Sequence, residues 1–316
     1  MASNEQLYDA GAGKKLLEGH QEFDIFISAF NLSDRVRHTF DKVAAKDKYW
    51  IIHNEYKFGE QELPTDARRL TSNSSSEADF IIDTFGSIQS LDPSLRIAVD
   101  ITGFMRPHLM FMMYYLRERG INKFALIYTE PSQYKRKSET IFSSDVLEVR
   151  QINGYEGLHT IDMTGDVLIV GVGYDHDLIS HVLASKGNAR QVQLLSLPSL
   201  SADMYQESLI RLHKVSDNST SLPEDQLAYA SANDPFATYI VLGETLERLY
   251  GHYEVISNLY LSPLATKPQA VGFAMFYLSH LVGKSASIMF PFASSYSKDT
   301  SKGVGRAWLY EMNFSQ

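Results

Sequence analysis

The chain contains no cysteine among its 316 residues. This absence excludes a disulfide-stapled scaffold, a thiolate metal site and a cysteine nucleophile. Long uncharged runs are also lacking: the apolar stretch 109–116 is far shorter than the roughly 20 residues that a membrane-spanning helix needs. The first residues, Met-Ala-Ser-Asn-Glu-Gln-Leu, have neither the basic nor the apolar part of a signal peptide. We therefore expect a cytoplasmic protein without a membrane segment.

Positive charge is in deficit. The chain has 29 Lys and Arg against 38 Asp and Glu, a formal net charge of −9. A broad nucleic-acid-binding surface needs a basic face, so this composition argues against one, although it is compatible with a local basic pocket. The hydrophobic content of 44% is that of an ordinary globular chain. The length allows two domains of ordinary size.

Familiar catalytic motifs are missing as well. The sequence has no G-x-S-x-G elbow, no Walker A motif and no H-E-x-x-H, and it indicates no particular catalytic group or cofactor. The nearest match is Gly171-Val-Gly173, in which His176 stands where a dinucleotide fingerprint has its third glycine. Asp175 and Asp177 would repel a pyrophosphate, so we do not expect NAD to bind there.

The same acidic stretch offers ligands for a metal. Asp175, His176 and Asp177 are followed by His181, one helical turn beyond Asp177. The pattern fits an N-cap aspartate and a solvated helix face better than a metal site. We predict no metal here.

Apolar runs alternate with segments of helical periodicity along the whole chain. This alternation predicts parallel βαβ units with right-handed crossovers. Expected helices cover 76–89, 109–119, 177–185, about 202–213 and 235–250, besides one that begins after Asp34. Expected strands cover 23–30, 48–53, 96–101, 124–128, 147–152, 166–173, 191–197, 255–261 and 285–290, with 306–310 as a closing edge strand.

A strand, a short polar loop and an apolar helix occupy 100–116. Thr102 and Gly103 form the loop, and Arg106-Pro107 opens the helix. Proline suits the first turn of a helix because its missing N–H would be unpaired there. The arrangement directs a cation and the positive end of a helix toward whatever lies above the strand.

This unit recurs at 261–277, where Lys267-Pro268 takes the place of Arg106-Pro107. Two further stretches match in register: 23–34 aligns with 166–177, and 126–134 aligns with 288–296. We predict an α/β fold of two similar Rossmann-like, doubly wound parallel-sheet halves that arose by internal duplication. The predicted division is a polar lead-in at 1–22, a first half at 23–150 and a second half at 151–316.

Ligands of open parallel sheets bind beyond the carboxyl ends of the strands, and the loops singled out here follow predicted strands. We expect Arg106 and Lys267 to supply charge, Thr102 and Thr266 to supply hydrogen bonds, and Tyr134 and Tyr296 to act as lids or stacking platforms. The full set of predicted ligand contacts is Thr102, Gly103, Arg106, His108, Tyr134, Gly171, Gly173, Tyr174, Thr266, Lys267, Gln269, Tyr296, Ser301 and Gly303.

The loop of Thr102, Gly103 and Arg106-Pro107 resembles the ligand loop of the CRISPR-associated Rossmann-fold (CARF) sensors. Its pairing with a second copy in one chain resembles the SAVED domains, which look like two fused sensors. The resemblance implies binding of a cyclic oligonucleotide second messenger across two halves, in an antiviral defence system. The chain departs from that pattern because nothing outside the halves is large enough for an effector nuclease or TIR domain.

Three hypotheses follow. In the first, the protein is a sensor or regulatory subunit that binds a nucleotide or another phosphate-bearing small molecule in a cleft between its halves. An effector protein is its possible partner. The second is an enzyme of nucleotide or sugar-nucleotide turnover, a hydrolase or glycosyltransferase, that uses the same cleft. The third is a protein-interaction subunit that binds no ligand.

Overall fold

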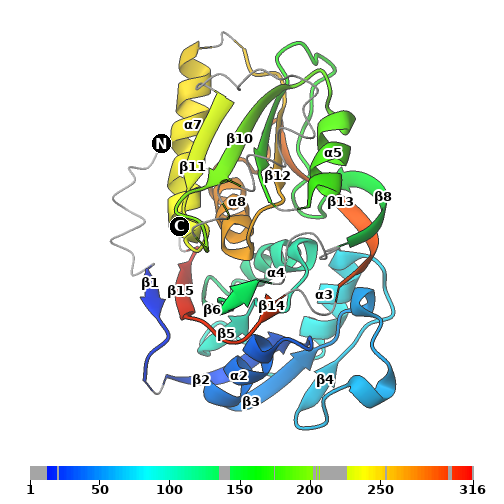
Figure 1. Ribbon diagram of the computed structural model, residues 1–316, viewed down its shortest axis with the longest axis vertical. Coiled ribbons are helices and arrows are strands. Elements are labelled where there is room, and N and C mark those ends of the chain that lie inside the picture. The colour runs from blue at the N-terminus through cyan, green and yellow to red at the C-terminus, as the bar shows by residue number, and fades with distance from the viewer. Residues whose placement is uncertain are drawn as a thin grey trace. The chain divides into compact units, whose positions relative to one another are not determined.

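The computed structural model describes residues 13–19, 21–134, 143–173, 175–201, 204, 206, 226–252, 255–297 and 301–314. The helix expected at about 202–213 is therefore described only at 204 and 206. The chain divides into two compact units. The first unit comprises Met1–Ser144 and Ser295–Gln316, and the second comprises Asp145–Ser294. Each unit is built on one sheet (Figure 1).

The sheet of the first unit has seven strands in the order β1-β15-β6-β5-β2-β3-β4. Strands β2 to β6 are mutually parallel, and β15 runs antiparallel to both β6 and β1. Their bounds are β1 Lys14–Leu16, β2 Glu22–Ala29, β3 Ala44–Ile51, β4 Arg68–Leu70, β5 Ile97–Asp100, β6 Lys123–Thr129 and β15 Ala307–Asn313.

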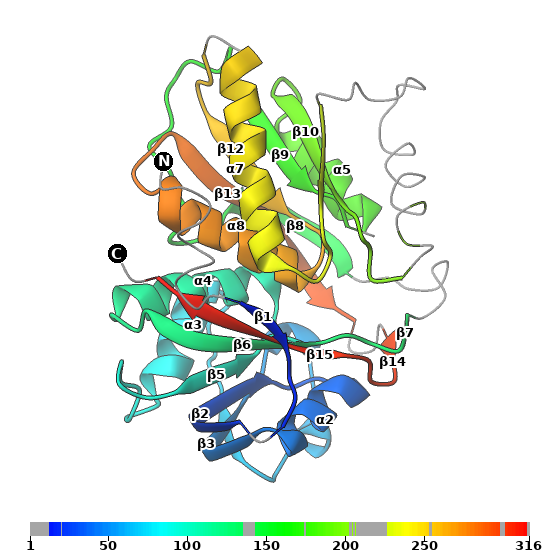
Figure 2. The same cartoon turned by 90° about the vertical axis from the view of Figure 1, so that its left-hand side faces the viewer.

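Helices cover both faces of this sheet, which is why β2 and β5 are nearly continuous apolar runs. Figure 2 shows α3 (Glu77–Gly86) and α4 (Arg106–Glu118) on one face and α2 (Asp34–Lys42) on the other. The core on the α2 side is aromatic: the Phe40 ring stacks on buried Trp50 with centroids 3.6 Å apart.

The second unit has six strands in the order β11-β10-β9-β12-β13-β8. Strands β9 to β13 are mutually parallel. The helix α5 (His176–Ser185) lies on one face, and α7 (Pro235–His252) and α8 (Lys267–His280) lie on the other (Figure 2). The strands are β8 Ser143–Gln151, β9 Val167–Gly171, β10 Arg190–Ser196, β11 Leu227–Ala230, β12 Leu259–Pro263 and β13 Ala286–Tyr296.

Both sheets repeat one topology. When the five parallel strands of each are numbered along the chain, their spatial order is 3-2-1-4-5 in both units. This is the order of the Rossmann fold. The prediction of two similar Rossmann-like α/β halves is therefore confirmed.

The division of the chain differs from the predicted one because each sheet receives a strand that follows the fifth strand of the other. β8 follows β6 in the chain but joins the second sheet beside β13, whereas β15 follows β13 and joins the first sheet beside β6. The stretch predicted as an edge strand at 306–310 lies between two partner strands. Apolar periodicity predicts that a segment is a strand, but it does not predict which sheet the strand joins.

Two polar stretches contain strands that were predicted as loops. The 54–76 stretch includes β4 and the short 3-10 helices η1 (Asn54–Tyr56) and η2 (Glu60–Glu62), and β11 lies in the stretch before Asn233. Both strands are short and lie at a sheet edge, where few residues need to be apolar. Among the described residues, no helix has the length and apolarity required to cross a membrane.

Candidate functional site

The order of the first sheet reverses between β2 and β5, so its topological switch point lies beyond the carboxyl ends of these strands. The loop after β5 is fixed there by buried hydrogen bonds. The Asp100 carboxylate accepts from the Ser28 hydroxyl at 2.8 Å and from the Thr102 N–H at 3.0 Å. The Thr102 hydroxyl oxygen accepts from the Thr129 N–H at 3.0 Å. Thr102 is fully buried and holds this loop to the end of β6; a contact with ligand stays a prediction.

Gly103 allows the β5 loop to lie against the end of β2. A Cβ at this position would lie 1.9 Å from the carbonyl oxygen of Ala29. The second unit has the reverse contact: a Cβ on Gly173, after β9, would lie 2.1 Å from the carbonyl oxygen of Leu264, after β12. Gly171 ends β9 beside the Phe273 ring. These predicted ligand contacts have a packing role that their sequence pattern did not distinguish from ligand binding.

The helices that follow the two repeated loops begin at the residues aligned by the repeat. Helix α4 starts at Arg106 and α8 at Lys267, each with proline second. The two N-termini differ in one respect. The N-cap residue of α4 is Met105, whose side chain makes no capping hydrogen bond within the described part of the chain, whereas Thr266 and Gln269 form a capping box on α8. The first turn of α8 is thus capped by its own side chains, and that of α4 is not capped by its N-cap residue.

Gln269 also joins two strands of the second sheet. Its Oε1 accepts from the Ser196 hydroxyl at 2.9 Å, and its Nε2 donates to the Ala230 carbonyl at 3.2 Å. Gln269 is completely buried, and Thr266 and Lys267 are half-buried. The geometry gives Gln269 a structural role at the ends of β10 and β11.

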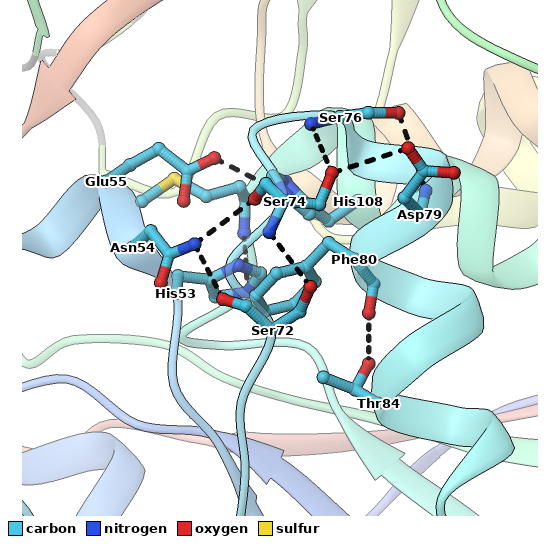
Figure 3. A network of polar contacts seen from close by, with 11 residues as sticks. His53, Asn54, Glu55, Ser72, Ser74, Ser76, Asp79, Phe80, Thr84 and His108 are labelled. Atoms are coloured by element: carbon cyan, nitrogen blue, oxygen red, sulfur yellow. Dashed lines mark hydrogen bonds and ion pairs between the residues drawn. The ribbon is translucent and has the colours of Figure 1, made fainter.

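Three side chains from two elements converge at the carboxyl edge of the first sheet (Figure 3). His53 immediately precedes η1, Glu55 lies within it, and His108 is the third residue of α4. One ligand atom from each residue lies within 4.8 Å of the other two. His108 Nε2 is 3.4 Å from Glu55 Oε1. Both histidines are buried, and Glu55 is partly exposed.

Neighbouring residues hold this turn in place. The Asn54 amide donates to the carbonyls of Ser72 at 2.9 Å and Ser74 at 3.2 Å (Figure 3). The Tyr56 hydroxyl donates to the Gly103 carbonyl at 3.0 Å. The loop after β3 is thus tied both to the loop before α3 and to the loop before α4, so the three converging side chains come from a rigid frame.

The pKa of Tyr56 is affected by several charged groups around it. Burial raises the pKa of Tyr56, and the charge of Glu55 acts in the same direction. A hydrogen bond with Asn31 and the charges of Arg35 and Arg106 act in the opposite direction on this pKa. Groups that follow β2, β3 and β5 in the chain, among them Arg106, therefore act on the pKa of this one tyrosine.

The two predicted lid segments meet in a small ribbon. β7 (Gln133–Tyr134) pairs antiparallel with β14 (Ser301–Lys302), so that Tyr134 lies opposite Ser301. The Gly303 N–H donates to Asp34 Oδ2 at 3.3 Å, and Gly303 has a φ of 67°. The sequence placed Ser301, Gly303 and Tyr296 in the second half. They belong to the first unit.

The lid role of Tyr134 and Tyr296 stays a prediction, and Tyr174 lies outside the described residues.

The acidic stretch before α5 fits the interpretation that it starts a helix. Asp175 is the N-cap residue, and its carboxylate accepts from the Leu178 N–H at 3.4 Å.

Sequence reasoning missed His53 and Glu55. A signal was present, because a His-x-Glu pair begins at the last residue of an expected strand, at the edge where ligands of parallel sheets bind. Its partner His108 lies far away in the sequence, and only the sheet order brings them together. No protein-family model, curated protein or solved structure matches this chain.

Proposed function

We propose that the chain binds a nucleotide or another phosphate-bearing ligand at the carboxyl edge of the first sheet, with Arg106 as the principal cation. One observation carries the proposal: α4 begins at Arg106, beside the switch point of the first sheet. The N-terminus of a helix attracts anions through its backbone N–H groups and its dipole. A guanidinium at the same end adds directed hydrogen bonds to phosphate oxygens.

The fold supports the ligand class by analogy. Rossmann sheets with this strand order bind nucleotides at their switch point. The resemblance of the loop to CARF and SAVED sensors adds cyclic oligonucleotides to the candidates. Lys267 begins α8 in the second unit and is not part of this proposed site; the capping box at Thr266 and Gln269 satisfies the N-terminus of that helix.

Replacing Arg106 with alanine is expected to weaken binding of a phosphate-bearing ligand by about 10- to 100-fold. A hydrogen bond to a charged group contributes roughly 1.5–3 kcal/mol, which corresponds to this range. Isothermal titration with mono-, di- and cyclic nucleotides and sugar nucleotides measures the change. We expect Lys267→Ala to change the dissociation constant by less than about threefold.

The matched control is Arg119→Ala, an exposed arginine at the opposite end of α4. It removes the same charge from the same helix and should leave affinity unchanged. Equal affinities of wild type and Arg106→Ala for every ligand would contradict the proposal. So would equal losses in Arg106→Ala and Arg119→Ala, because net charge alone would then explain binding.

A further inference from the structure

The separation of His108 and Glu55 fits two ligands of a common ion better than a direct ion pair. Charge-assisted N–H···O bonds measure about 2.7–2.9 Å. The separation between His108 Nε2 and Glu55 Oε1 is 3.4 Å. Two ligands about 2.05 Å from a tetrahedrally coordinated zinc ion would themselves lie about 3.4 Å apart. His53 completes the cluster within 4.8 Å.

Aromatic side chains fix the two imidazoles. Phe80 stacks on the His53 ring, with centroids 5.1 Å apart and planes at 12°, and it meets His108 edge-on at 4.9 Å. Phe104 packs edge-on against His53 at 5.3 Å. The Met105 N–H lies 3.5 Å from His53 Nε2, which is longer than the usual 2.7–3.2 Å.

The surroundings of the Glu55 carboxylate also favour a bound cation. Its Oε2 atom is buried and has no hydrogen-bond partner among the residues that the structure describes. A buried carboxylate oxygen without a partner is unfavourable. A bound cation would compensate it, because the carboxylate would then have an ionic partner in addition to the His108 contact.

We propose that His53, Glu55 and His108 bind a divalent transition-metal ion of the zinc type. Imidazole suits Zn²⁺ and neighbouring first-row ions, whereas Mg²⁺ and Ca²⁺ prefer oxygen ligands throughout. Two histidines and one glutamate are a ligand set of catalytic zinc sites, which keep a fourth position open. That position could take water or an oxygen of a small anion. This site does not depend on the nucleotide proposal.

The test uses the untagged full chain, stripped with a chelator and dialysed. Titration with Zn²⁺ alone, without nucleotide, should show one tight equivalent per chain. Glu55→Gln and His53→Gln should each weaken zinc binding by about 100-fold or more, because even changes to outer-shell partners of a metal ligand cost about 10- to 100-fold. Glu55→Gln keeps the size of the side chain and removes its charge.

His159→Gln is the matched control. His159 is half-buried, stacks on Tyr260 and contacts the Asn258 amide, but it lies in the second unit, far along the chain from the cluster. This variant should bind zinc like the wild type. Equal zinc affinity in Glu55→Gln, His53→Gln and wild type would overturn the proposal, and the cluster would then be a buried ion pair.

Cobalt substitution keeps the proposal falsifiable if the variants do not fold. Co²⁺ added to the stripped wild type should give the intense visible d–d bands of a four- or five-coordinate ion, and Zn²⁺ should abolish them. Bands no stronger than those of aqueous Co²⁺ would overturn the proposal. Because neither readout uses a nucleotide, failure of the metal site and failure of the nucleotide proposal are distinguishable.

Discussion

Gly103→Ala is expected to lower the free energy of unfolding by about 3 kcal/mol or more. The new Cβ would lie 1.9 Å from the Ala29 carbonyl oxygen, and that atom belongs to the backbone of a central strand. Overpacking in a core costs about 1–3 kcal/mol, and more where the neighbour cannot move. Gly173→Ala should have a similar effect through Leu264. Urea unfolding of each variant measures both changes.

Gly251→Ala is the control for these substitutions. Gly251 lies in α7, is exposed, and a Cβ there would meet nothing within 4 Å. Alanine should stabilise the protein by roughly 0.5 kcal/mol, because it restricts the unfolded chain and favours helix. A loss below 1 kcal/mol in Gly103→Ala would show that β2 and the loop separate easily, which contradicts the close approach described here.

Tyr310→Ala is expected to destabilise the protein by about 3–5 kcal/mol, the range for removing a large buried aromatic side chain. Tyr310 is fully buried on β15, whose partners are β6 and β1. A residue on the solvent-facing side of the strand would be partly exposed, and its truncation would cost less. The measurement therefore tests which face of β15 is turned to the core.

Glu311 supplies the matched comparison on the same strand. Its side chain is 42% exposed and pairs with Lys15 at 3.1 Å. An exposed ion pair contributes less than about 1 kcal/mol, so Glu311→Ala should change stability little. Similar losses in Tyr310→Ala and Glu311→Ala would contradict the assigned faces of β15.

The repeated elements could be predicted because their chemistry is local. Buried parallel strands read as apolar runs, and Pro107 and Pro268 mark helix starts within one residue. The alignment matched Arg106 with Lys267, and in the structure each is the first residue of its helix, three residues before the start expected for the first of them. These features depend on residues within a few positions of one another, so the sequence carries them directly.

Long-range pairing could not be predicted. The exchange of β8 and β15 between the sheets depends on which strand edges are available, and an apolar strand fits either edge. For the same reason the ribbon of Tyr134 and Ser301 was assigned to two halves. The His53, Glu55 and His108 cluster joins residues separated by more than fifty positions, so only the folded sheet defines it.

The most direct test of the central claim, a phosphate-binding edge at α4, is the thermal unfolding midpoint of the wild type against a panel of nucleotides. The panel holds mono-, di- and cyclic nucleotides and sugar nucleotides, with nucleosides as controls. Ligand at a hundredfold excess over its dissociation constant stabilises the folded state by about 2.7 kcal/mol. We predict that at least one phosphate-bearing compound raises the midpoint in wild type but not in Arg106→Ala. A panel without any shift, or a shift that Arg106→Ala retains in full, would contradict the account.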